Sequence, residues 1–418
     1  MRQWMVAAKK ADFYAIAEKF HVDPVVARII RNREVIGEKN IRIYLGGNLS
    51  DLSDPHQMKD MDRLVEILAQ KIRKQVRIRI IGDYDVDGVT SSHLFLTALR
   101  RVGAKVDVVI PHRIQDGYGL SLHLLQQAKE DGVDTILTCD NGIAAIDEIA
   151  WAKAQKMTVL VTDHHAVPFE EHEGRRTEKK SLADAVVNPH QQDCGYPYKE
   201  LCGAGVAWNV IRVLYENYDM DKREAEDLLD FVAMATVCDV MSLTGENRIL
   251  VKEGLKRIRH TKNIGLQALM QACNVQPENI SAYHFGYVLG PCVNATGRLD
   301  TARHALRLFE TGQETEAEEI ARDLVDLNQE RKELTLQGVE MAKKLCEEGG
   351  YENDPILVLF LPDVHESIAG LIAGRIREMY NRPVFVLTRG EEGVKGSGRS
   401  TENYSMYENM CGCAELFT

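Results

Sequence analysis

Carboxylate and imidazole side chains recur at three places in this sequence, each time directly after a short apolar segment. The segments read GDYDVDG, CDNG and TDHH, and their chemical groups belong to Asp83, Asp85, Asp87, Asp140, Asp163, His164 and His165. Aspartates this close together repel one another, and a bound divalent cation would relieve the repulsion. An Asp-rich turn that caps the next helix is the simpler alternative for one segment. Because the pattern recurs, we favour a metal site.

The donor types indicate which metal would bind. Oxygen ligands with one or two imidazoles favour Mn²⁺ or Mg²⁺, whereas a structural zinc site would recruit thiolates. The nine cysteines are scattered, and no CxxC pair occurs. We interpret them as small buried residues of a reducing compartment. Asp239, which ends the apolar segment Phe231–Val237, is expected to contribute to the same metal cluster because a buried carboxylate needs a partner.

The elements that must position these residues alternate between β-branched and helical segments. The predicted strands are Val76–Ile81, Val106–Ile110, Thr135–Thr138, Thr158–Thr162 and Ala185–Val187. The predicted intervening helices are Val89–Val102, Ser121–Asp131 and Ala144–Lys156. This alternation predicts an α/β fold with a mainly parallel sheet covered on both faces. Ligands of such sheets bind beyond the carboxyl ends of the strands, which is where the three motifs fall.

The rest of the chain is predicted to flank this sheet. Residues 1–75 read as an N-terminal helical cap, residues 76–312 as the metal-binding domain, and residues 313–350 as a long connector helix. Residues 351–418 restart a strand–helix–strand pattern and form a smaller α/β domain. Gly290–Asp300 is predicted to be a loop. The segment VKGSGRS is interpreted as a Gly-rich turn whose backbone could approach a phosphate.

Composition limits the functional classes. A chain of 418 residues predicts two or more domains, and 44% hydrophobic with 27% charged residues are ordinary globular values. A net charge of −12 argues against a general nucleic-acid coat protein, although it is compatible with a nuclease that has a local basic groove. No apolar run is long enough to span a membrane, and no secretory signal is evident. We therefore expect a cytoplasmic protein without membrane partners.

The motifs match a known family. GDYDVDG, CDNG, TDHH and CDV resemble the DHH phosphoesterase superfamily, and four further segments narrow the resemblance to its RecJ branch of single-stranded-DNA-specific exonucleases. These segments are NPHQQDCGYPYKELCGAGVAWNV, GPCVNATGRLD, HESIAGLIAGRI and VKGSGRS. The resemblance covers nearly the whole chain. It implies a DHH catalytic domain over 76–312 and an incomplete DHH-associated domain over 351–418.

The resemblance also implies an activity and a ligand set. It implies a two-metal phosphodiesterase that removes nucleotides from the 5′ end of single-stranded DNA in DNA repair and recombination, with a helicase or single-strand-binding protein as a further partner. Asp83 would bind one Mn²⁺ or Mg²⁺ ion and Asp85 the other, and Asp140 would bridge them. His164 and Asp239 would complete the second site.

Three more positions take roles from the resemblance. His165 would face the scissile phosphate as a general acid or an electrostatic clamp. Asp87 would orient the loop that carries the ligands. Arg79 stands where pyrophosphatase-like members of the superfamily have a histidine, which leaves the first metal site poor in ligands and suits the nuclease branch.

Recognition of a strand end needs a cationic pocket away from the metals. We expect Arg113, Arg298, Ser397 and Arg399 to bind a 5′-terminal phosphate, because arginine binds phosphate through two parallel hydrogen bonds. In the resembled family the second domain continues to a Gly-Gly-His motif, and an OB-fold usually follows. The sequence ends at Thr418 before either of them, so weaker binding of long strands is expected.

Other functions stay open at this point. The enzymatic alternative is a DHH phosphodiesterase of short oligonucleotides, cyclic dinucleotides or nucleotide bisphosphates. A metal-free scaffold protein would have lost ligands, and all of them are present here. A nuclease of double-stranded DNA is also conceivable, but no segment resembles a groove-reading helix.

Overall fold

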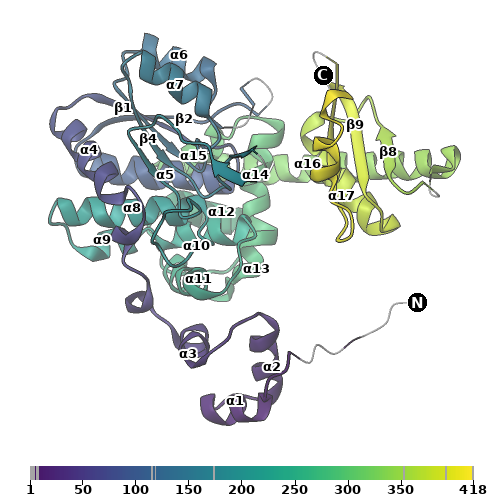
Figure 1. Cartoon of the computed structure of the whole chain (residues 1–418), viewed down its shortest axis with the longest axis horizontal. Helices are drawn as coiled ribbons and strands as arrows, with labels where there is room; N and C mark the ends of the chain where they lie inside the picture. Colours follow the sequence, from purple (N-terminus) through teal and green to yellow (C-terminus); the bar gives the residue numbers. More distant parts are fainter. Residues whose placement is uncertain are drawn as a thin grey trace.

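The computed structural model describes residues 5, 9–113, 116–117, 119–172, 175–351, 354–390 and 393–416 (Figure 1). At its centre is a five-stranded sheet in the order β2-β1-β3-β4-β7, in which all neighbouring strands are parallel. The strands are β1 (Arg77–Ile81), β2 (Lys105–Val109), β3 (Thr135–Cys139), β4 (Thr158–Thr162) and β7 (Ala185–Val187). The predicted parallel sheet is therefore confirmed.

Helices cover both faces of the sheet because its strands are apolar on both sides. In β1, Ile78 and Ile80 belong to a large core on one face, and Ile81 belongs to a smaller core on the other. The large core is formed with α4 (Met61–Arg73), α5 (Val86–Arg101), α8 (Gly203–Asn217) and α10 (Leu229–Cys238). The smaller core is formed with α6 (Leu122–Glu130) and α7 (Ile146–Ala154).

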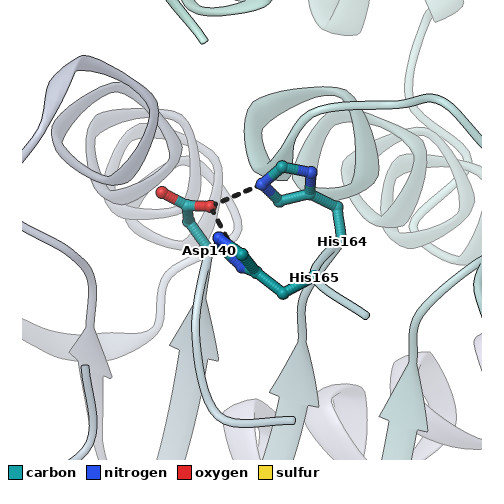
Figure 2. A group of neighbouring side chains, drawn as sticks. All are labelled: Asp140, His164 and His165. Atoms are coloured by element: carbon teal, nitrogen blue, oxygen red, sulfur yellow. Dashed lines mark ion pairs between the residues drawn. The ribbon is translucent and has the colours of Figure 1, made fainter. Parts of the chain in front are cut away.

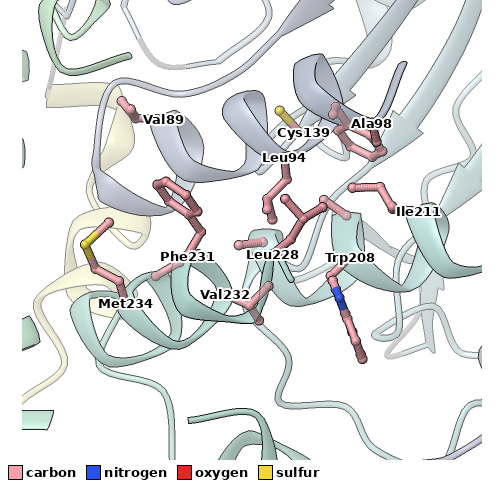
Figure 3. Packing of buried hydrophobic residues seen from close by; sticks show 14 of the residues in the cluster. Val89, Leu94, Ala98, Cys139, Trp208, Ile211, Leu228, Phe231, Val232 and Met234 are labelled. Carbon is pink, nitrogen blue, oxygen red and sulfur yellow. The ribbon is translucent and has the colours of Figure 1, made fainter. Parts of the chain in front are cut away.

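Figure 3 shows the packing of the large core. Leu94 of α5 points toward α8 and α10, where Ile211 and Val232 lie. Burial of an aliphatic side chain of this size contributes about 1.5–3 kcal/mol to folding. Many such contacts hold α5 rigidly under the sheet, so the residues at its N-terminus are fixed in place.

A helical layer continues from α10 toward the second domain. It contains α9 (Lys222–Glu226), α11 (Gly245–Ile258), α12 (Ile264–Ala272), α13 (Ala282–His284), a π-helical turn (Phe285–Leu289), α14 (Gly290–Leu299) and α15 (Arg303–Glu310). The prediction of a loop over Gly290–Asp300 is wrong, because α14 occupies it. Pro291 lies in the first turn of α14, where its missing N–H costs nothing. Arg298 thus lies on the last turn of a helix.

The N-terminal segment has two parts. Helices α1 (Phe13–Phe20), α2 (Pro24–Asn32) and α3 (Glu38–Gly46) bury a small separate core around Ile30 and Ile41, away from the sheet (Figure 1). After two short 3₁₀ turns (Leu49–Asp51 and Pro55–Gln57), α4 packs on α8 and β7.

An unpredicted hairpin of β5 (Phe169–His172) and β6 (Arg175–Glu178) follows β4.

The predicted connector helix is α16 (Glu314–Gly349), which leads to a smaller three-stranded domain (Figure 1). Its sheet has the order β10-β9-β8. Its elements are β8 (Leu357–Phe360), a 3₁₀ turn (Glu366–Ile368), α17 (Ala369–Tyr380), β9 (Val384–Gly390), β10 (Gly393–Arg399), α18 (Met406–Cys411) and a last 3₁₀ turn (Ala414–Leu416).

The interpretation of VKGSGRS as a turn is wrong, since it forms β10, antiparallel to β9. Two of its glycines make room for neighbouring side chains. A Cβ at Gly396 would lie 2.4 Å from Leu387 Cδ2, and one at Gly398 would lie 2.8 Å from Met406 Cε. These glycines therefore serve packing within the second domain. No helix among the described residues is both long and apolar enough to cross a membrane.

Candidate metal centre and phosphate pocket

The first two motifs meet where the strand order reverses. From β1 the chain passes to β2 on one side and then to β3 on the other, so the loops after β1 and β3 diverge and leave a crevice between them. Asp83 follows β1 and Asp140 follows β3 at this crevice. The Asn141 amide joins the two loops, because its Nδ2 donates to the carbonyls of Ile81 (3.1 Å) and Cys139 (2.9 Å).

Each aspartate of GDYDVDG has a different environment. Asp83 is buried, and its Oδ1 has no hydrogen-bond partner among the described residues. Asp85 is the N-cap of α5 and accepts hydrogen bonds from the first-turn backbone. Asp87 is buried and accepts from the N–H groups of Gly203 (2.6 Å) and Ala204 (2.8 Å) at the start of α8. The carboxylates of Asp85 and Asp87 are thus held by backbone N–H groups at helix N-termini.

One nitrogen of His164 faces three carboxylates. His164 Nε2 lies 3.0 Å from Asp140 Oδ1, 3.6 Å from Asp87 Oδ2 and 3.6 Å from Asp239 Oδ2. Asp239 is the residue that ends α10, as expected. Figure 2 shows the imidazoles of His164 and His165 directed toward the same oxygen of Asp140.

Asp163 is a site residue to which sequence reasoning gave no role. Its Oδ1 accepts hydrogen bonds from the backbone of His164 (2.7 Å) and from His165 Nδ1 (2.8 Å), and its Oδ2 accepts one from the Ile143 N–H (2.9 Å). Although burial opposes ionisation, the hydrogen bond and charge of His165 hold the pKa of Asp163 below its usual range. In return, and against burial, Asp163 raises the pKa of His165 to about 9. The carboxylate orients the imidazole and keeps it protonated.

The remaining carboxylates resist ionisation because they are buried close to one another. Burial, followed by repulsion from Asp85, raises the pKa of Asp83 to about 8. Burial, followed by repulsion from Asp87, raises the pKa of Asp239 to about 8 and that of Asp140 well above its usual range. A cluster of this kind needs protons or cations to be stable in its folded geometry.

The donor atoms fit two divalent cations. Ligand atoms of Asp83, Asp85 and Asp140 lie within 4.8 Å of one another, and so do those of Asp87, His164 and Asp239. Asp140 also groups with both histidines, so it stands between the two sets. The neighbouring Cys139 is a poor ligand, because burial raises the pKa of its thiol to about 12. Oxygen and imidazole donors without a thiolate suit Mn²⁺ or Mg²⁺.

One further contact holds the metal loop in place. Asn294 of α14 accepts a hydrogen bond from the Val86 N–H (3.1 Å), which fastens the loop after β1 to the helical layer.

Arg79 points away from the cluster. Its Nε and Nη2 donate to the two oxygens of Asp107 (2.7 and 3.0 Å), and its Nη1 lies 2.8 Å from Asp131. Arg79 is therefore an ion-pair partner within the sheet.

A cationic region lies between the two domains. Arg298 Nη1 donates to the carbonyl of Ser367 (2.6 Å), which joins α14 to the second domain. Burial and the nearby charge of Arg113 lower the pKa of Arg298 to about 10, and Arg399 acts in the same direction. Arg113 lies over the ring of Tyr84, 4.6 Å from its centroid. The predicted phosphate-binding arginines therefore repel one another and favour an anion.

Ser397 and Arg399 lie against the first turn of α17. A Cβ at Gly370 would be 3.0 Å from Ser397 Oγ and 2.7 Å from Arg399 Nη2, so only glycine leaves these groups in place. A helix N-terminus attracts anions through its unpaired N–H groups and its dipole. Beside it is a cavity of about 200 Å³ lined by Tyr84, Arg113, Gly117, Glu366, Ser367, Lys395 and Gly396.

Comparison with known proteins gives consistent results. Residues 77–236 match the DHH family, N-terminal domain. The chain is 36% identical over 397 residues to the single-stranded-DNA-specific exonuclease RecJ of Haemophilus influenzae, covering 92% of this chain and 67% of that protein. It is 33% identical over 404 residues to the same-named protein of Bacillus subtilis, covering 96% and 49%. The chain thus spans between about half and two thirds of the length of these relatives.

Solved structures agree with the fold. An exonuclease RecJ bound to manganese superimposes with a TM-score of 0.73 at 32% identity, covering 85% of each chain. A RecJ from Thermus thermophilus in complex with Mg²⁺ gives a TM-score of 0.73 at 28% identity, covering 97% of this chain and 53% of that one. Both neighbours are complexes with the cations that the donor set of this chain fits.

Proposed function

The chain belongs to the RecJ family of DHH proteins, and from this premise we propose that it is an exonuclease that hydrolyses single-stranded DNA from the 5′ end with two bound Mn²⁺ or Mg²⁺ ions. The observation that carries the proposal is the position of Asp140. Its carboxylate lies between one group of donors with Asp83 and Asp85 and another around His164. A carboxylate placed between two groups of donors would help to hold two cations close together, as two-metal hydrolysis of a phosphodiester uses them.

Each residue takes a defined part in hydrolysis. When bound, two cations supply the positive charge that activates a water and stabilises the leaving oxygen. Asp83 and Asp85 would hold one side of the centre, because both group with Asp140 rather than being divided between the two ions as the sequence led us to expect, and His164 and Asp239 would hold the other. Asp87, whose oxygens both accept from backbone N–H groups, would fix the loop geometry.

His165 supports the reacting phosphate. Its side chain is 44% exposed, and its Nδ1 is hydrogen-bonded to Asp163, so its Nε2 would be the nitrogen that meets a substrate. With a pKa of about 9, the imidazole is protonated at neutral pH. It would therefore donate a hydrogen bond or proton to a phosphoryl or leaving oxygen.

Selection of the strand end would come from the cationic region. Arg113, Arg298, Ser397 and Arg399 would hold a 5′-terminal phosphate at the N-terminus of α17, on the side of the metal centre that faces the second domain. The mutual repulsion of the arginines supports this role, because a phosphate would relieve it. A DNA substrate would place the protein in the cytoplasm, where a helicase or a single-strand-binding protein could supply the strand.

The first test compares substrates. Purified protein with Mn²⁺ would receive a long single strand with a 5′ phosphate, labelled at either end, and separately a ribodinucleotide. We expect the long strand to be shortened from its 5′ end, and Asp140→Asn to be inactive. Turnover of the dinucleotide alone would move the assignment to the small-phosphodiester branch of the superfamily. Shortening from the 3′ end would contradict the proposed polarity.

The second test concerns the phosphate pocket. Arg399→Ala should reduce cleavage of a 5′-phosphorylated strand more than cleavage of a 5′-hydroxyl strand. Arg375→Ala, an exposed arginine on α17 itself, is the matched control and should leave the ratio unchanged. If both variants keep the ratio of the unmodified protein, the pocket does not read the terminal phosphate.

A further inference from the structure

Two cysteines from different helices bring their sulfur atoms into contact. Cys273 follows directly after α12, and Cys292 lies in the first turn of α14. Their Sγ atoms are 3.8 Å apart, and both residues are reduced. A disulfide has an S–S distance of about 2.05 Å. The sulfurs therefore need to approach by less than about 2 Å for a bond to form.

The surroundings of Cys292 favour its thiolate. The amide of Asn328 on α16 donates to Cys292 Sγ (3.5 Å). The hydrogen bond from Cys273 is the largest influence, and with Asn328 and the charges of Lys332 and Arg331 it holds the pKa of Cys292 below its usual range despite burial. A thiolate beside positive charge is the reactive form of cysteine.

Two other buried cysteines of the domain have different environments. Cys139 and Cys202 lie near the carboxylate cluster, where burial and negative charge raise the pKa of both thiols. Their hydrogen-bond contacts are with the hydroxyls of Ser92 and Thr236. The Cys273–Cys292 pair differs from them because its two sulfur atoms face each other; Cys292 is buried and Cys273, beside it, is partly buried.

We propose that Cys273 and Cys292 form a dithiol that closes to a reversible disulfide on reaction with a peroxide. The Cys292 thiolate attacks one peroxide oxygen and the O–O bond breaks, which gives a sulfenic acid and an alkoxide, or hydroxide from hydrogen peroxide; this leaving oxygen takes from solvent the proton that Cys292 lost on ionising and departs as an alcohol or water. The Cys273 sulfur then attacks the sulfenic sulfur, forming the S–S bond and releasing water. Two thiols are oxidised and one peroxide is reduced. A dithiol reductant reverses the reaction by thiol–disulfide exchange.

Helix α14 connects this pair to the metal centre. Two residues after Cys292, Asn294 holds the Val86 N–H, and a Cβ at Gly297 would lie 2.3 Å from the Tyr84 carbonyl oxygen. A disulfide that draws Cys292 toward Cys273 would pull on the helix that supports the metal loop. We infer that oxidation weakens the binding of Mn²⁺ at the metal centre. This consequence rests on the proposed function.

The disulfide itself can be tested without measuring nuclease activity. The full chain would carry Cys411→Ser and Cys413→Ser, which remove the neighbouring cysteines near the C-terminus, and would be treated with hydrogen peroxide. Peptide mapping should show one linked peptide pair containing Cys273 and Cys292, lost on reduction. Adding Cys273→Ser or Cys292→Ser should abolish the link, whereas Cys346→Ser should not. Absence of the linked pair, or its persistence in the Cys273→Ser protein, would overturn the proposal.

The consequence needs a separate measurement. We expect the oxidised protein to need a several-fold higher Mn²⁺ concentration for half-maximal thermal stabilisation, with recovery after reduction and no change in Cys273→Ser protein. The same concentration in both redox states would overturn the coupling through α14. This readout is metal binding, so it stays informative even if the chain were inactive on single-stranded DNA.

Discussion

Asp87 Oδ2 accepts a 2.6 Å hydrogen bond from the backbone N–H of Gly203, a residue 116 positions later in the sequence. Asp87 Oδ1 accepts a second bond from Ala204 (2.8 Å). A carboxylate at a helix N-terminus satisfies N–H groups that have no partner within the helix and interacts favourably with its dipole. The contact fastens the metal loop to α8, so we expect both stability and the proposed catalysis to depend on this side chain.

Asp87→Asn should therefore reduce both properties. Hydrogen bonds to a charged acceptor contribute about 1.5–3 kcal/mol, and we expect the free energy of unfolding in chelator to fall by about 2 kcal/mol. Urea denaturation of the metal-free protein measures this. Asp326→Asn, an exposed position on α16, serves as the control. An unchanged free energy of unfolding with lost activity would show that Asp87 acts through the metal rather than through α8.

Gly203→Ala should damage the centre through a steric clash. A Cβ at this position would lie 2.7 Å from Asp140 Cβ, so Asp140 or α8 must move. Overpacking of this kind costs about 1–3 kcal/mol, and displacement of the shared carboxylate should reduce Mn²⁺-dependent activity at least tenfold. For Gly205→Ala on α8 the three nearest atoms all belong to the Leu201 side chain, the first at 3.3 Å, so this variant is the matched control. Equal activity of the two variants would argue against a tightly positioned Asp140.

The metal-free protein should lose stability as pH rises. Asp83 and Asp239 have folded-state pKa values of about 8 against 3.8 when unfolded. Between these values the folded state binds more protons than the unfolded state, so the contribution of these groups is fully present below about pH 4 and is lost as pH rises through 8. Thermal melting in chelator at a series of pH values measures the slope of stability against pH. Saturating Mn²⁺ should flatten it, and a hundredfold excess over Kd should add about 2.7 kcal/mol.

Asp140→Asn separates charge repulsion from metal binding. Removing one charge from the cluster should raise the melting temperature in chelator, because the pKa of Asp140 is raised by burial and by its acidic neighbours. The same change should abolish the gain in melting temperature on adding Mn²⁺. A variant that is less stable in chelator yet still stabilised by Mn²⁺ would contradict the placement of Asp140 between two cations.

Asp163→Asn should change the pH profile of the reaction. The Asp163 carboxylate holds the pKa of His165 at about 9, so activity that needs protonated His165 should decline only above that pH. The neutral amide should shift this decline to lower pH and reduce the rate at pH 8 by about 10–100-fold, as for other residues that orient a catalytic group. Rate measurements from pH 6 to 10 with saturating Mn²⁺ would show the shift. An unshifted decline would exclude His165 as the titrating group.

The sequence by itself determined the central sheet and most of the carboxylate and imidazole side chains that gather at its edge. Apolar β-branched segments alternating with helices permit little besides a covered parallel sheet, whose strands end at one edge. The carboxylates after β1 and β3 were therefore bound to lie at one edge of the sheet, and the strand order makes them neighbours. Motif resemblance added the family, because the segments from GDYDVDG to VKGSGRS are distinctive in combination.

Only the tertiary structure decided the contacts between distant segments. The cap of α8 by Asp87, the support of Val86 by Asn294 and the approach of Cys273 to Cys292 each depend on how helices pack, and no local pattern records that. Packing also overrode local signals, since Gly290–Leu299 is helical despite its glycines and proline. Periodicity reports which face of an element is buried, whereas a hydrogen bond between remote residues is set by the packed geometry.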